Sequence, residues 1–199
     1  MKALISLVLV GIVLFGIGAG TWAYFSDTET SSGNYIAAGT LDLKLGDYDT
    51  DTWYEDPNVP SYTVEDVYPG WSDWLDFDAL NDGSIDGDLY MKVTYTEAGG
   101  DNPEPEGTPD DPVLDDNLCV AITIDGSPLD LSAYDDNSDG CVSLSEIADQ
   151  YISLGDLVAG TYKNIRIDVN IPSDVGNEIQ GDTLTIDVEF KLMQDGASP

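Results

Sequence analysis

Apolar and polar residues alternate along several stretches of this chain, and that alternation limits the fold more than any other feature of the sequence. It is clearest in residues 165–171 and 184–192, where Ile, Val, Leu or Phe takes every second position. Other stretches follow the same rule at residues 40–45, 74–80, 89–95 and 118–124. A period of two puts one set of side chains on one face of a strand. With turn residues between the stretches, the pattern predicts an all-β sandwich of two packed sheets.

Two stretches depart from this pattern. Residues 143–154 are the only part of the sequence that favours a helix. Residues 97–116 are rich in proline, glycine and acidic residues, and they predict a long solvated loop. We therefore expect residues 40–199 to form one sandwich domain that carries this acidic loop.

The charge of the chain excludes several classes of function. It has 39 acidic and 6 basic residues, a formal net charge of -33, and no histidine. So anionic a surface repels phosphate backbones and anionic lipid headgroups, which argues against a nucleic acid or a membrane surface as partner. The absence of histidine excludes His-based catalytic triads and the usual zinc-protease motif. We expect a protein that is not an enzyme.

The first 23 residues are typical of a secretory signal. Lys2 precedes a long apolar run, and the small residues Thr21 and Ala23 place a cleavage site between Ala23 and Tyr24. An uncleaved anchor is the alternative, because about 20 apolar residues can span a bilayer. No charged stop follows the run at once, which favours cleavage. The mature protein is then expected to be secreted, extracellular and free of the membrane.

Residues 135–146 match the twelve-residue EF-hand loop at its diagnostic positions. Gly140 stands where the loop turns sharply, and the last ligand lies at the start of the helix expected over residues 143–154. The ligands would be Asp135, Asn137, Asp139, the Cys141 backbone carbonyl, Ser143 through water, and Glu146. Hard oxygen ligands favour calcium over transition metals. The competing interpretation is an acidic turn that arises by chance in an Asp-rich chain.

A second acidic stretch has aspartates at positions 47, 49 and 51. We interpret it as a solvated turn, because Thr52 stands where an EF-hand loop requires glycine.

The chain has two cysteines, Cys119 and Cys141. An even count in an exported protein favours a disulfide, since such a bond persists outside the cytoplasm. Two buried free thiols are the alternative. A bridge would fasten the predicted calcium loop to the strand that carries Val120 and Ile122.

Several short motifs are shared with a known family. Residues 20–27 read GTWAYFSD and residues 39–43 read GTLDL, while YPGW at 68–71, LNDGS at 80–84 and NEIQGD at 177–182 give weaker support. Together they resemble the TasA/camelysin family of secreted fibre proteins. The resemblance implies a jelly-roll-like sandwich that polymerises head-to-tail with copies of itself by donor-strand complementation. Some family members are labelled peptidases, an activity that the absence of histidine argues against here.

Residues 24–39 are the expected donor arm. Apolar residues lie only near its two ends, at Tyr24, Phe25, Tyr35 and Ile36, with a polar stretch between them. A frayed N-terminus is the alternative. The leading function is thus a calcium-braced subunit of an extracellular filament, either a pilus or a biofilm-matrix fibre.

A different class of function remains open. The chain could be a monomeric, calcium-stabilised surface binding module or adhesin. Trp53, Trp71 and Trp74 could line a face that binds a carbohydrate or a protein, or they could belong to the sandwich core.

Overall fold

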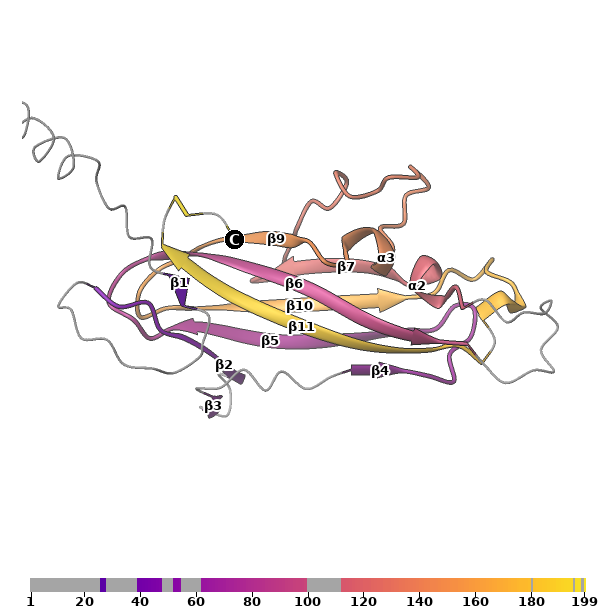
Figure 1. Ribbon diagram of the computed structural model, residues 1–199, viewed down its shortest axis with the longest axis horizontal. Helices are drawn as coiled ribbons and strands as arrows, with labels where there is room; N and C mark the ends of the chain where they lie inside the picture. Colours follow the sequence, from indigo (N-terminus) through magenta and orange to yellow (C-terminus); the bar gives the residue numbers. More distant parts are fainter. Residues whose placement is uncertain are drawn as a thin grey trace, which may run out of the picture.

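The computed structural model describes residues 26–27, 39–47, 52–54, 62–99, 112–179, 181–194, 196–197 and 199. These residues form two antiparallel sheets that pack face to face and do not close into a barrel (Figure 1). The prediction of an all-β sandwich is confirmed.

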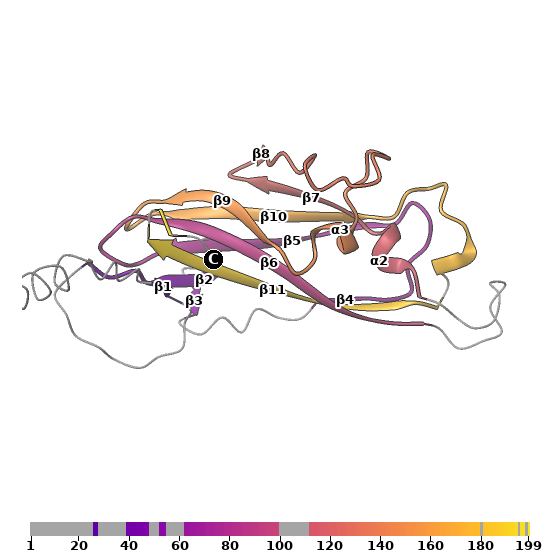
Figure 2. The same ribbon diagram turned by 45° about the horizontal axis from the view of Figure 1, so that its top comes forward.

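Two long strands form the centre of the first sheet. They are β6 (Gly87–Ala98) and β11 (Thr183–Gln194), which pair along their whole lengths. On the far side of β6 lies β9 (Tyr151–Leu157). The opposite side of β11 pairs with two short strands, β1 (Ser26–Asp27) and β4 (Tyr62–Val64), which lie toward opposite ends of it (Figure 2).

The second sheet has six strands. Their order is β3 (Thr52–Tyr54), β2 (Leu43–Asp47), β5 (Ser72–Asn81), β10 (Tyr162–Asn170), β7 (Cys119–Ile124) and β8 (Ser127–Pro128). The long pairing of β5 with β10 forms its centre, with Phe77 opposite Ile165.

Alternating apolar residues from both sheets form the core. On β11 every second side chain is buried, from Leu184 to Leu192, and β10 contributes Ile165, Ile167 and Val169 in the same way. The rings of Phe77 and Phe190 meet across the sandwich with their centroids 5.3 Å apart. The same alternation that predicted the strands therefore also determines which side chains enter the core.

The predicted helix over residues 143–154 is wrong beyond its first turn. Helix α3 spans only Leu144–Ile147, and Ala148 is already extended. Residues 151–157 are strand β9, in which Ile152 and Leu154 are buried on one face. The physical reason is that this stretch has an apolar period of two, which suits the free side of β6.

The predicted acidic loop over residues 97–116 is shorter than expected. Glu97 and Ala98 end strand β6, and residues 114–117 form helix α2 (Leu114–Asn117). Leu114 is fully buried, so burial of a single apolar side chain holds this end of the loop against the core. A short 3-10 helix, η1 (Asn177–Ile179), precedes β11.

Candidate functional site

Residues 39–43 and the turn at 81–84 lie against each other, although the sequence separates them by about forty residues. The backbone N–H of Asp82 donates to the Asp42 carbonyl over 2.7 Å, and that of Ser84 donates to the Thr40 carbonyl over 2.7 Å. The Thr40 N–H donates in turn to the Ser84 hydroxyl over 2.9 Å. Two of the motifs that carry the family resemblance thus form one structural junction.

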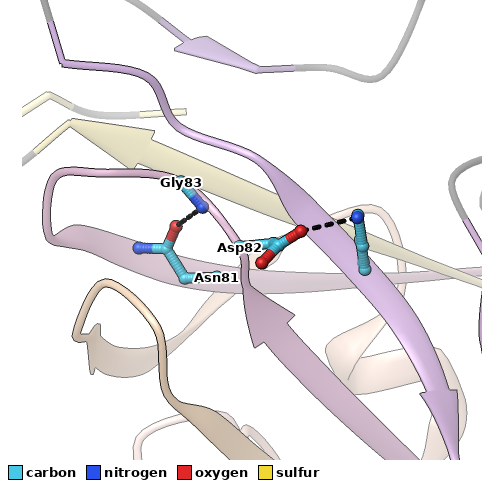
Figure 3. A network of polar contacts seen from close by, with 4 residues as sticks. Asn81, Asp82 and Gly83 are labelled. Atoms are coloured by element: carbon cyan, nitrogen blue, oxygen red, sulfur yellow. Dashed lines mark hydrogen bonds and ion pairs between the residues drawn. The ribbon is translucent and has the colours of Figure 1, made fainter. Parts of the chain in front are cut away.

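Asn81 is the centre of this junction (Figure 3). Its side chain is fully buried, and its Nδ2 donates to the carbonyls of Ile85 and Leu157. Its Oδ1 accepts the N–H of Gly83 over 3.0 Å. A buried amide needs all of these partners, because an unpaired buried polar group is costly.

Gly83 and Lys44 complete the junction. A side chain at Gly83 would collide with the Thr40 carbonyl oxygen, so only glycine allows the two segments to approach this closely. The Lys44 ammonium forms an ion pair with the Asp82 carboxylate, 2.6 Å from Nζ to Oδ2. The junction therefore fixes the point at which the chain from residue 39 enters the sandwich.

The arm that precedes this junction is described only at β1. Tyr24, Phe25, Tyr35 and Ile36, with the predicted cleavage site after Ala23, lie outside the described residues. Ser26 pairs with Met193, and Asp27 pairs with Leu192.

Within the described parts of the chain, the side of β11 that faces away from β6 is paired only near its ends. β1 pairs there with Leu192 and Met193, and β4 pairs with residues 184–186. Among the described residues, no strand pairs with this side over residues 187–191. Beneath it, Phe77 contacts Phe190 yet remains only partly buried, as does Leu75. Sequence reasoning did not find this edge, because β1 and β4 are too short to show a period.

The predicted calcium loop has an ordered backbone between β8 and α3. Side chains from its first half cap three of its backbone N–H groups: Asp139 N–H by Asn137 Oδ1 over 2.8 Å, Cys141 N–H by Asp139 Oδ1 over 2.7 Å, and Gly140 N–H by Asp135 Oδ2 over 3.2 Å. Ser138 and Gly140 adopt positive φ angles of 61° and 87°. The side chains of Asp135, Asn137 and Asp139 thus turn back toward the backbone of their own loop.

Glu146 closes the loop from its far end. Its Oε1 accepts the Asp136 N–H over 3.0 Å, and its Oε2 accepts the Ser143 N–H over 2.8 Å. Asp135 Oδ1 is buried and has no hydrogen-bond partner. An unsatisfied buried carboxylate oxygen in such a turn fits a cation, because the ion would supply the missing interaction. Within the described ranges, however, no three His, Cys, Asp or Glu side chains already converge as a metal cluster.

The second half of the loop is fastened to β7. Cys141 and Cys119 form a disulfide with their Cα atoms 5.4 Å apart. Val120 N–H donates to the Val142 carbonyl over 2.8 Å, and Leu144 N–H donates to the Leu118 carbonyl over 2.9 Å. Strand β7 therefore positions the Cys141 carbonyl, Ser143 and the start of α3.

The three tryptophans that could line a binding face have different surroundings. Trp71 is partly buried and packs against the core, as the core interpretation predicted for it. Trp74 is exposed on the second sheet, and Trp53 is half-buried at its edge.

The model of one protein family, described as camelysin metallo-endopeptidase, matches residues 2–107. The chain belongs to this family. The match includes the junction of residues 39–43 with residues 81–84, and the family resemblance is confirmed. No curated protein matches the chain. Membership of the camelysin family fits a secreted structural or matrix-fibre protein.

The family description also mentions a metallo-endopeptidase, and TasA-type members of the family are structural. This camelysin-family chain has no histidine. No catalytic site emerges from the described residues. That the protein is not an enzyme stays a prediction. None of the helices in the described ranges is long and apolar enough to cross a membrane.

Proposed function

We propose that this protein is a structural subunit of an extracellular filament that grows head-to-tail by donor-strand complementation. The observation that carries the proposal is the edge of β11 over residues 187–191, which no described strand covers. Such an edge presents backbone N–H and C=O groups that a strand from another molecule can pair with.

The side chains beneath this edge support the proposal. Leu75 and Phe77 point toward the core but remain partly exposed, although their neighbour Ala79 is completely buried. When an added strand covers such apolar side chains, the complex is stabilised by about 25 cal/mol for each Å² of apolar surface removed from water. An arm with apolar residues at its ends suits this task.

The junction at Asn81 supports the head-to-tail direction of growth. Because residues 39–43 are fastened to the turn at 81–84, the arm joins the sandwich at a fixed point. In this structure β1 of the arm pairs with β11 of the same chain, and donation to another copy would replace that pairing. A donor segment of one copy must reach the next copy in one orientation, and repetition of such a contact gives an open filament.

Calcium bound in residues 135–146 would brace the subunit. The loop follows β8 and is fastened to β7, and the Ser145 hydroxyl donates a hydrogen bond to Asp116 in α2 over 2.6 Å. A cation there would neutralise carboxylates in a chain of net charge -33. A lone extracellular loop of this kind binds weakly, on the order of 10⁻⁴ to 10⁻³ M, which suits bracing and not signalling.

A truncation tests the polymerisation mechanism. The mature chain and a variant that lacks residues 24–33 are purified, and both are viewed by electron microscopy with millimolar calcium. We expect filaments from the mature chain, and a folded, soluble monomer from the variant. A peptide of residues 24–39 should cap growing ends, whereas a scrambled peptide should not. Filaments of normal length from the truncated protein would overturn the donor-strand mechanism.

A further inference from the structure

The outer face of the second sheet carries aromatic and polar side chains that the filament function does not use. Residues of β5 and β10 lie opposite one another there: Trp74 opposite Asp168, Asp76 opposite Arg166, Asp78 opposite Asn164, and Leu80 opposite Tyr162. The alternate residues of both strands face the core. We name this surface, formed by the outward residues of β5 and β10 with Trp53 of β3, the aromatic face.

Trp74 is held in one orientation although it is exposed. Its side chain is 54% exposed, and the Arg166 guanidinium carbon lies 4.8 Å from the ring centroid. Arg166 is itself fixed by Asp168, which accepts from Nε and Nη2 at 2.8 Å each. A ring fixed in this way loses little conformational entropy when a ligand stacks on it.

A second aromatic group lies toward the other end of the face. Trp53 lies directly over Gly46, where an added Cβ would be only 3.0 Å from its ring carbon Cε3. One edge of the Trp53 ring therefore lies close to the β2 backbone at Gly46. Tyr162 lies beside it, with centroids 6.4 Å apart and planes tilted by 58°, and is 38% exposed.

Polar side chains lie between the two aromatic groups. The Asn164 amide donates to the Asp78 carboxylate over 2.9 Å. Asp78 itself is buried, so the polar groups open to a ligand are those of half-buried Asn164 and of exposed Asp76, which lies across from Arg166. Planar amides and carboxylates bind hydroxyl groups with defined geometry, while aromatic rings stack on the apolar C–H faces of sugar rings. A flat surface with both kinds of group, separated along the strands, suits an extended chain of sugar units.

The charge of the molecule selects among occupants. A net charge of -33 repels polyanions, and it also opposes face-to-face docking of a second copy. The face itself contributes Asp76, Asp78 and Asp168, with Arg166 as its cation. We propose that the aromatic face binds an uncharged polysaccharide. This site is independent of the donor-strand mechanism and would let a filament hold a surrounding glycan matrix.

Affinity electrophoresis tests the proposal. The purified mature protein is run in native gels that contain dextran, laminarin or mannan, with alginate as the anionic polysaccharide. We expect at least one neutral polysaccharide to retard the protein. Trp74→Ala should weaken the apparent affinity roughly tenfold or more, as for a central aromatic contact. Trp74→Phe should retain most of the binding. Tyr162→Ala provides a second variant at the other end of the face.

Tyr151→Ala is the matched control, since Tyr151 stacks with Lys92 and Lys191 on the first sheet. It should bind like the unmodified protein, and circular dichroism should show that each variant is folded. The proposal is overturned if no neutral polysaccharide retards the protein, if alginate retards it equally, or if folded Trp74→Ala and Tyr162→Ala both bind normally. It is also overturned if Trp74→Ala changes the size of the protein without polysaccharide, because the face would then join copies of the chain.

Discussion

The Ser145 hydroxyl donates a hydrogen bond to the Asp116 carboxylate over 2.6 Å, and this contact joins α3 to α2. Helix α2 also contacts the C-terminal end of β6. There the Asp115 N–H donates to Glu97 Oε1 over 3.1 Å, and the Tyr95 hydroxyl donates to the Asp115 carboxylate. Helix α2 therefore connects the predicted calcium loop to a carboxylate network on the first sheet.

Stability should depend on the protonation of Glu97. Burial, with the nearby Asp115 charge, raises the pKa of Glu97 from 4.5 to about 7. The folded state therefore binds a proton that the unfolded state has lost between these values. Stability from this group is complete below pH 4.5 and is lost as the pH rises through about 7. We expect Glu97→Gln to remove this loss when urea unfolding at pH 5 and pH 8 is compared with the unmodified protein.

Glu178→Gln is the control for this measurement. Hydrogen bonds from backbone N–H groups lower the pKa of Glu178 below its ordinary value. Its contribution therefore changes only in more acidic solution, outside the range from pH 5 to pH 8. An unchanged difference between pH 5 and pH 8 in Glu97→Gln would contradict the role of Glu97.

Reduction of the disulfide should weaken the fold. The bridge joins Cys119 to Cys141 across a sequence separation of 22 residues, and it restricts the unfolded chain. Loss of a bridge that closes a loop of this size costs roughly 3 kcal/mol. Urea unfolding with and without dithiothreitol measures the loss. A Cys119→Ser/Cys141→Ser variant should unfold at the same urea midpoint as the reduced protein, and dithiothreitol should not change that midpoint. Equal midpoints for the oxidised and the reduced protein would contradict the prediction.

Much of the fold could be predicted because the long strands have one solvent-exposed face and one buried face, which gives an alternating sequence pattern. In β10 and β11 the apolar period of two survives over nearly the whole strand, so their position and their core side chains follow from the sequence. Strand β9 was mistaken for a helix because Ser143 and Glu146 form a capping box that starts one. Short strands such as β4 have too few residues to show any period.

The candidate sites also differ in how far the sequence could predict them. Residues 135–146 are contiguous, so spacing alone identified them. The junction of Asn81 with residues 39–43 depends on segments distant in sequence, and only shared motifs pointed to both. The pairing of Trp74 with Arg166 depends on the register of β5 against β10, which no local pattern contains.

Calcium should stabilise the protein through Glu146. A ligand that binds only the folded state stabilises it by mass action, here by roughly 1.5 to 3 kcal/mol at about 10 mM calcium for the expected affinity. We expect calcium to raise the melting temperature and EGTA to reverse the rise. Glu146→Gln should abolish the increment, because an amide cannot bind the ion through two carboxylate oxygens.

The increment is the quantity to compare, not the melting temperature itself. Glu146 also accepts the backbone N–H groups of Ser143 and Asp136, so its replacement weakens the loop without calcium. Asp136→Asn is the matched control, since it removes one charge from position 2 of the same loop, which supplies no side-chain ligand. Asp136→Asn should respond to calcium like the unmodified protein. If Glu146→Gln responds equally, residues 135–146 are an acidic turn and calcium does not brace the subunit.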